Sequence, residues 1–321
     1  MVLYCRTINF WDANEQPDNL MNSKARKASK NRVLSHSRFH SVVIVLLSFI
    51  SLLLLSSQED DPGHIEGDYL GQTLPGTHPE LFAEGIIPED LHSSPVFSMD
   101  GKSLYYKTLD GKGIMVMNRE GDRWKPARPL FVNEEADNSD DPCISPSDNK
   151  LWFTYYSKED NREYIRYCEK INSTSCHTGQ PIGKLNVLDL HWQFSIASSK
   201  NIYFASNGSI YYSVLQDGKY LEPAKLGPEI NSDFSECTPY VSPDEKVLIF
   251  ARSNSEKPDL FISRRTEDGS WATATPLGND INTENHEMCP LLSPDGKYLF
   301  FLSSRAGLFS AYWIDASVLN I

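Results

Sequence analysis

The chain has 321 residues and a formal net charge of −13 at pH 7, with 40% hydrophobic residues. The charge is uneven: residues 1–57 hold seven Lys/Arg against three Asp/Glu, whereas residues 58–321 hold 23 against 40. An acidic domain repels phosphate backbones, so this balance argues against nucleic acid as a partner.

The N-terminal part has the pattern of an export segment. Residues 1–40 carry a basic run and no hydrophobic periodicity, which predicts a disordered cytoplasmic tail or a signal n-region that starts at Met1 or Met21. Residues 41–57 are apolar and uncharged, with a length between a signal-peptide core and a spanning helix of about 20 residues. We expect one hydrophobic helix here, as a transmembrane anchor or a cleaved signal. Either outcome places the rest on the periplasmic or extracellular face, with membrane contact only through residues 41–57.

Residues 58–77 are rich in Gly, Pro and acidic residues and are predicted to form a linker. From residue 78 to residue 321 the chain repeats a short apolar segment that ends in serine. The copies begin at Pro95, Pro142, Trp192, Pro239 and Pro290. Their intervals of 47, 50, 47 and 51 residues are typical of propeller blades.

Each copy is followed by further predicted strands. Runs of aromatic and aliphatic residues begin at Leu104, Leu151, Ile202, Leu248 and Leu299. A third strand comes next, and in three repeats a Gly-Asp or Asp-Gly turn precedes an outer segment. Four strands per repeat predict an all-β propeller of five four-stranded blades, preceded by the N-terminal hydrophobic helix.

The last repeat carries a more specific signal. Ser-Pro-Asp-Gly-Lys at residues 293–297, followed by aromatic strands, resembles the WD40-like repeats of TolB-type β-propellers. Residues 286–290 and 312–315 resemble the closing repeat of a group of bacterial secreted propellers without a defined activity. The resemblance covers about residues 78–321. It implies the fold and does not imply a particular activity.

The two ends of the repeat region complement each other. Residues 79–87 look like the outer segment of a blade but precede the first repeat, while the last repeat has only three strands, ending at residues 311–314. We expect residues 79–87 to pair beside residues 311–314 and so close the ring, which protects sheet edges. This closure favours five blades over six.

The six cysteines contain no Cys-x-x-Cys pair, which argues against a zinc knuckle. Cys168 and Cys176 lie eight residues apart across a predicted hairpin and are a candidate disulfide in an oxidising compartment. We interpret the other cysteines of the repeats, Cys143, Cys237 and Cys289, as small buried apolar residues.

Polar residues precede the inner strand of each repeat, and rotational symmetry brings these positions to one mouth of the channel. They are His92, Asp140, Asp141, His191, Glu236, His286 and Glu287. Carboxylates and imidazoles predict a binding rim that favours a cation or a polyhydroxylated ligand. A solvated ring that only holds the strand ends is the alternative. No cofactor other than this channel-bound cation is indicated.

The sequence contains no Gly-x-Ser-x-Gly nucleophile elbow. We therefore expect a binding or protein-interaction module, with an envelope protein or a polar or carbohydrate ligand as its partner. The first alternative is a carbohydrate-active hydrolase or lyase that uses carboxylates at the channel mouth, which would need to lie about 5–10 Å apart. The second alternative is a purely structural scaffold.

Overall fold

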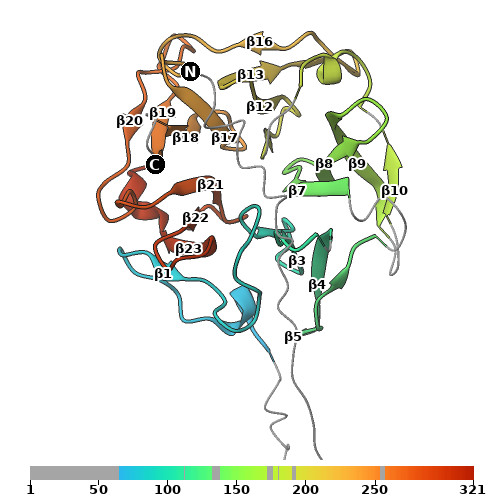
Figure 1. The fold of residues 1–321 in the computed structure, drawn as a ribbon, viewed down its shortest axis with the longest axis vertical. Helices are drawn as coiled ribbons and strands as arrows, with labels where there is room; N and C mark the ends of the chain where they lie inside the picture. The colour runs from blue at the N-terminus through green and yellow to red at the C-terminus, as the bar shows by residue number, and fades with distance from the viewer. Residues whose placement is uncertain are drawn as a thin grey trace, which may run out of the picture. The chain divides into compact units, whose positions relative to one another are not determined.

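The computed structural model describes residues 65–111, 113–131, 138–171, 176–179, 181–189, 193–253 and 257–321. In the described part, five antiparallel sheets of four or five strands surround a central axis, so the predicted five-bladed β-propeller is confirmed (Figure 1). The expected tail at residues 1–40 and helix at residues 41–57 lie outside the described residues. In the part that is described, no helix has the length and apolarity needed to cross a membrane. Export and anchoring stay predictions.

Each blade begins with its innermost strand. Blade 1 consists of β2 (Val96–Phe97), β3 (Ser103–Lys107), β4 (Ile114–Glu120), β5 (Arg123–Trp124) and β6 (Arg128–Pro129). Blade 2 consists of β7 (Ser139–Ile144), β8 (Leu151–Ser157), β9 (Arg162–Ile171) and β10 (Cys176–Gly179). Blade 3 consists of β11 (Ser195–Ile196), β12 (Ile202–Ser206), β13 (Ser209–Ser213) and β16 (Ala224–Lys225), with a separate hairpin of β14 (Leu215–Gln216) and β15 (Lys219–Tyr220).

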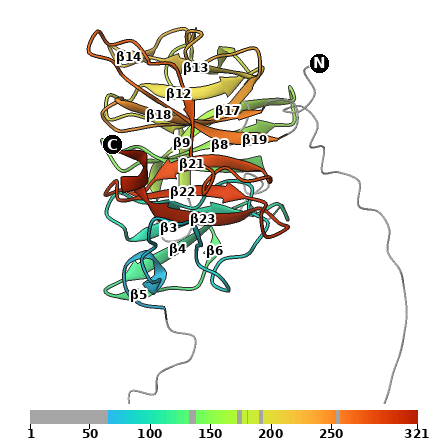
Figure 2. The same cartoon turned by 90° about the vertical axis from the view of Figure 1, so that its left-hand side faces the viewer.

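The last two blades match the repeat pattern best. Blade 4 consists of β17 (Ser235–Val241), β18 (Val247–Ser253), β19 (Pro258–Arg264) and β20 (Thr275–Pro276). Blade 5 consists of β21 (Glu287–Leu292), β22 (Tyr298–Ser303), β23 (Ser310–Asp315) and the N-terminal strand β1 (Glu80–Leu81). Three short 3₁₀ helices complete the described elements: η1 (Asp68–Gly71), η3 (Leu185–Val187) and η4 (Ala316–Leu319). In Figure 2 the sheet of β21 to β23 lies between β17 and β18 on one side and β3 and β4 on the other.

The predicted ring closure is confirmed. Strand β1 pairs antiparallel with β23, with Glu80 opposite Trp313 and Leu81 opposite Tyr312. The next residue, Phe82, is buried, and its ring centroid lies 5.0 Å from that of Phe300 and 5.1 Å from that of Trp313. Edge-to-face aromatic pairs of this kind add to the burial of apolar area. The two ends of the described chain are therefore joined within one blade.

Residues 65–77, which the sequence analysis assigned to the linker, include a segment packed on the propeller. The backbone N–H of Trp124 donates to Ile65 O at 2.9 Å, and its indole N–H donates to Gly67 O at 2.8 Å. The ring of Tyr69 makes edge contacts with Phe97 and Tyr298. These contacts pack residues 65–69 against blades 1 and 5.

The Ser-Pro-Asp-Gly turn closes on itself. Ser293 Oγ donates to Asp295 Oδ1 at 2.6 Å and accepts from the backbone N–H of Tyr298 at 3.0 Å. Gly296 has φ +72°, which a residue without a Cβ adopts at low cost. Such local hydrogen bonding is the usual role of serine and aspartate in turns, as expected from the sequence.

An asparagine that the sequence analysis did not single out joins the outer segment of a blade to its third strand. Asn282 accepts the backbone N–H of Leu260 at 2.7 Å and donates to the carbonyl oxygens of Leu260 at 2.9 Å and Leu277 at 3.0 Å. Asn231 does the same with Ile210 and Leu226 one blade earlier. These side chains satisfy backbone groups that a short outer strand leaves unpaired.

Candidate functional site

Three inner strands carry the same irregularity directly before a proline. In β7, β17 and β21 the pairing register shifts, and Asp141, Thr238 and Cys289 have φ of +42°, +46° and +54°. A proline disfavours the α conformation for the residue before it, and a bulge accommodates one unpaired residue. A left-handed conformation costs a residue with a Cβ about 1–3 kcal/mol, so the surrounding contacts have to impose it.

Hydrogen bonds between blades supply those contacts. Ser94 Oγ, in the segment before β2, donates to Cys289 O at 2.6 Å. The backbone N–H of Cys289 donates to Thr238 Oγ1 at 3.1 Å. Blades 1, 5 and 4 are thereby linked in sequence at the level of the bulges, which holds the starts of the inner strands close to the channel axis.

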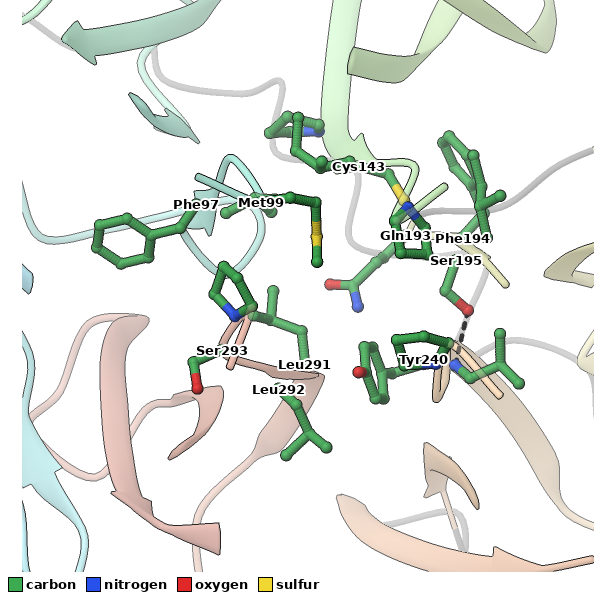
Figure 3. A pocket seen from close by; sticks show the side chains of 18 residues that line it. Phe97, Met99, Cys143, Gln193, Phe194, Ser195, Tyr240, Leu291, Leu292 and Ser293 are labelled. Carbon is green, nitrogen blue, oxygen red and sulfur yellow. Dashed lines mark hydrogen bonds between the residues drawn. The ribbon is translucent and has the colours of Figure 1, made fainter. Parts of the chain in front are cut away.

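A pocket lies on the channel axis and is lined by the later parts of the inner strands and the turns that follow (Figure 3). The residue after the proline position of each repeat faces it: Val96, Cys143, Gln193, Tyr240 and Leu291. The volume of the cavity that the centre of a water molecule can reach is about 80 Å³. One water needs about 10–15 Å³ by the same measure, so the pocket has room for several waters or one small apolar group.

Gln193 crosses the channel. Its side-chain amide lies near the middle of the ring of pocket side chains in Figure 3, and Nε2 donates to Pro290 O at 2.9 Å. Blade 3, which carries Gln193, is not a neighbour of blade 5 in the ring, so this hydrogen bond spans the axis. The side chain of Gln193 is buried and lines the pocket.

The pocket has little capacity for acid–base chemistry. Among the described residues, its lining contains no Asp, Glu, His, Lys or Arg. Burial raises the pKa of the Cys143 thiol to about 12, and burial also raises the pKa of Tyr240 above its ordinary value. Both groups are therefore neutral at physiological pH and present an apolar surface with two weak polar atoms.

At the opposite end of the inner strands, three of the predicted rim residues form a cluster. His92 Nδ1 lies 3.0 Å from Asp140 Oδ1 and 3.6 Å from Asp141 Oδ1. The side chains of His92 and Asp140 are 26% and 24% exposed, whereas that of Asp141 is 1% exposed. Oδ2 of Asp141 accepts from Thr154 Oγ1 at 3.4 Å.

The charges of this cluster act on one another. Burial alone would lower the pKa of His92, but the two carboxylates outweigh it and raise that pKa well above its usual value. Burial opposes the ionisation of Asp140, yet His92 and then Lys107 lower its pKa. Burial and the adjacent charge of Asp140 raise the pKa of Asp141. The ionised form is therefore disfavoured at Asp141, which is the less exposed of the two carboxylates.

The sequence analysis predicted that Glu236 and Glu287 belong to an open binding rim. The structure does not place them there. Both side chains are fully buried. Glu236 Oε1 accepts from Ser232 Oγ at 2.6 Å and from Arg252 Nε at 2.9 Å. Glu287 Oε1 accepts from Thr283 Oγ1 at 2.7 Å. These carboxylates fix the loops before β17 and β21, because each accepts hydrogen bonds from side chains of its own blade, although Oε2 of Glu236 has no hydrogen-bond partner among the described residues.

The remaining predicted residues lie apart from these groups or outside the described part. His191 is not among the described residues. The ring of His286 is partly buried and makes an edge contact with Phe309, 6.1 Å between centroids. Cys168 is disulfide-bonded, but the side chain of Cys176 is not described, so their pairing stays a prediction. Cys237 and Cys289 are buried, whereas Cys143 lines the pocket.

Sequence reasoning missed the pocket, although the signal was present. The second position of the repeat, after the proline or, in the third repeat, after Trp192, is apolar in four of the five repeats and is glutamine in the third. An alternation of inward and outward residues from that position would have placed these five side chains around the axis.

No family model and no curated protein matches the sequence. Similar solved structures include TolB from Acinetobacter baumannii, with 14% identity over 78% of this chain and 62% of that chain and a TM-score of 0.44. The chain thus spans less than two thirds of TolB. An endo-arabinase from Bacteroides thetaiotaomicron has 13% identity over 76% of this chain and 97% of that chain, with a TM-score of 0.46. The nidogen/laminin complex gives 11% identity, 67% and 74% coverage, and a TM-score of 0.45.

Proposed function

We propose that this chain is a binding module that accepts one small apolar group, such as a side chain of a partner protein, in the channel pocket. The observation that carries the proposal is the lining of the pocket, which is mostly apolar around its wall and is crossed by Gln193. Buried apolar anchors that fill a pocket dominate the energy of many protein interfaces.

The size of the pocket favours a side chain over a larger ligand. A drug-sized molecule occupies a site of several hundred Å³, and a sugar needs several convergent polar groups. Here the reachable space is about 80 Å³. Ser195 Oγ, one of the few polar atoms of the lining, already accepts the backbone N–H of Val241 at 2.9 Å.

A hydrolase activity is the second candidate function, and the chemistry of the pocket argues against it. General acid–base catalysis needs a group whose pKa lies near the working pH, within reach of the substrate. The titratable groups that line the pocket, Cys143 and Tyr240, have pKa values raised by burial. A binding function, by contrast, does not require carboxylates in the lining of the pocket.

Site-specific photo-crosslinking tests the proposal. A benzophenone amino acid replaces Met99, which lines the pocket and is partly exposed. In a control it replaces Leu221, which is 44% exposed in blade 3 and does not line the pocket. In cells that express the full chain, we expect a defined partner to crosslink from position 99 and not from position 221.

A filled pocket provides the second arm of the test. Val96→Trp places an indole where the lining leaves space, and we expect it to abolish the crosslink from position 99 while the protein stays folded by circular dichroism. A crosslink that persists in a folded Val96→Trp protein, or the absence of any crosslink specific to position 99, would contradict binding in this pocket.

A further inference from the structure

The cluster of His92, Asp140 and Asp141 contains buried atoms that no protein group satisfies. Among the described residues, His92 Nδ1 and Asp141 Oδ1 are buried and have no hydrogen-bond partner. Nδ1 lies 3.0 Å from Asp140 Oδ1, which is the distance of an ion pair when the imidazole is protonated. An unsatisfied buried polar atom costs about 1–3 kcal/mol, and more when it is charged.

Two other buried carboxylates of the propeller have different partners. Glu236 and Glu287 occupy the same position in their repeats as His92, three residues before the proline. Each of them binds an arginine and a hydroxyl of its own blade. In blades 4 and 5 the buried carboxylate therefore faces an arginine, although Oε2 of Glu236 has no partner among the described residues. Between blades 1 and 2 the imidazole of His92 faces the two carboxylates, and three ligand atoms lie close together.

The spacing of these atoms suits a metal ion. Ligand atoms bound at about 2.1 Å to an ion and separated by about 90–120° lie about 3.0–3.6 Å apart. The distances from His92 Nδ1 to Oδ1 of Asp140 and Oδ1 of Asp141, 3.0 Å and 3.6 Å, fall within this range. All three ligand atoms lie within 4.8 Å of one another. Asp140 is partly exposed, so its carboxylate can turn toward the ion and water can complete the coordination.

We propose that His92 Nδ1, Asp140 and Asp141 Oδ1 bind one divalent first-row transition-metal ion at the start of the inner strands. One imidazole nitrogen with two carboxylates favours zinc or manganese over calcium or magnesium, which prefer oxygen alone. The ion joins blade 1, which supplies His92, to blade 2, which supplies both aspartates. The site lies at the other end of the inner strands from the pocket and does not depend on the proposed function.

Zinc titration of the metal-free full chain tests the site. We expect isothermal titration calorimetry with Zn²⁺ to give one saturable site, and Mg²⁺ and Ca²⁺ to bind at least about tenfold more weakly. Asp141→Asn and His92→Gln should each weaken Zn²⁺ binding at least about tenfold, since loss of an outer-shell partner alone costs about 10–100-fold. Glu284→Gln is the matched control, because it removes the same charge from an exposed residue before β21.

Absorption spectroscopy of the wild-type protein with Co²⁺ tests the site without a variant, so the test still applies if a variant fails to fold. Co²⁺ bound to the site should give visible absorption bands that Zn²⁺ displaces. The proposal is overturned if the wild-type chain shows no saturable Zn²⁺ binding and no such bands. It is equally overturned if folded His92→Gln protein keeps the affinity of the wild type, or if Glu284→Gln loses affinity as strongly as His92→Gln.

Discussion

Replacement of Glu287 by glutamine should destabilise the propeller. Oε2 of Glu287 accepts from the backbone N–H of Thr283 at 3.0 Å, and Oε1 accepts from Ser303 Oγ at 2.8 Å and from Arg305 Nη2 at 3.4 Å. In Glu287→Gln an amide NH₂ takes the place of one carboxylate oxygen. Depending on its orientation, it faces either the backbone N–H of Thr283 or the donors around Oε1, and each orientation sets donor against donor.

The magnitude follows from these contacts. A hydrogen bond to a charged group contributes about 1.5–3 kcal/mol, and loss of one partner of a buried ion pair costs about 3–5 kcal/mol. Arg305 keeps other acceptors, because Nη2 also donates to Ile281 O at 2.7 Å and Nε to Ser303 Oγ at 2.9 Å. We therefore expect the lower end of the range, about 3 kcal/mol.

Urea denaturation followed by circular dichroism measures this change. With a slope of about 3 kcal/mol/M, a loss of about 3 kcal/mol lowers the midpoint by about 1 M. Glu284→Gln, which removes the same charge from an exposed side chain three residues earlier, should shift it little. If Glu287 belonged to a solvated rim, its replacement would relieve repulsion and stabilise the protein. A midpoint for Glu287→Gln that equals or exceeds that of Glu284→Gln would refute the reasoning.

Two further predictions concern the ring closure and the pocket. Phe82→Ala should lower the stability by about 3–5 kcal/mol, because it removes a buried ring from between Phe300 and Trp313; an unchanged melting temperature would show that β1 does not hold the ring closed. Cys143 should react slowly with iodoacetamide at pH 8, because burial raises the pKa of its thiol from 9.0 to about 12 and so reduces its thiolate fraction by about three orders of magnitude. Its labelling, followed by mass spectrometry, should rise with pH toward 12 in the folded protein, and a rate equal to that in urea would contradict this.

The fold could be predicted from the sequence because its determinants are local and repeated. The turn at residues 293–297 and the aromatic strand after it define a blade without reference to other blades. The closure by β1 was predictable for a related reason, since residues 79–87 resemble an outer segment and lack a blade of their own.

The site was only partly predictable, because the burial of a side chain depends on which residues the neighbouring strand places beside it. Glu236 and His92 precede their prolines by the same number of residues, yet one is buried and the other partly exposed. The difference comes from Arg252, sixteen residues after Glu236, which lies on the paired strand. Symmetry gives the position of a side chain around the axis, but the identity of its neighbours decides whether it is available to a ligand.

The pairing of β1 with β23 also sets the order in which the molecule can be completed. Glu80 and Trp313 are 233 positions apart in the sequence, and closing a loop of that length costs about 5 kcal/mol of chain entropy. Blades 1 to 4 form from segments that are adjacent in the sequence, whereas blade 5 is complete only when β1 and β23, from the two ends of the domain, have paired. Until then the edge of β23 is open, and the β1 segment of a second molecule competes for it. At high protein concentration during refolding, the natural by-product is therefore a dimer that exchanges its first strands.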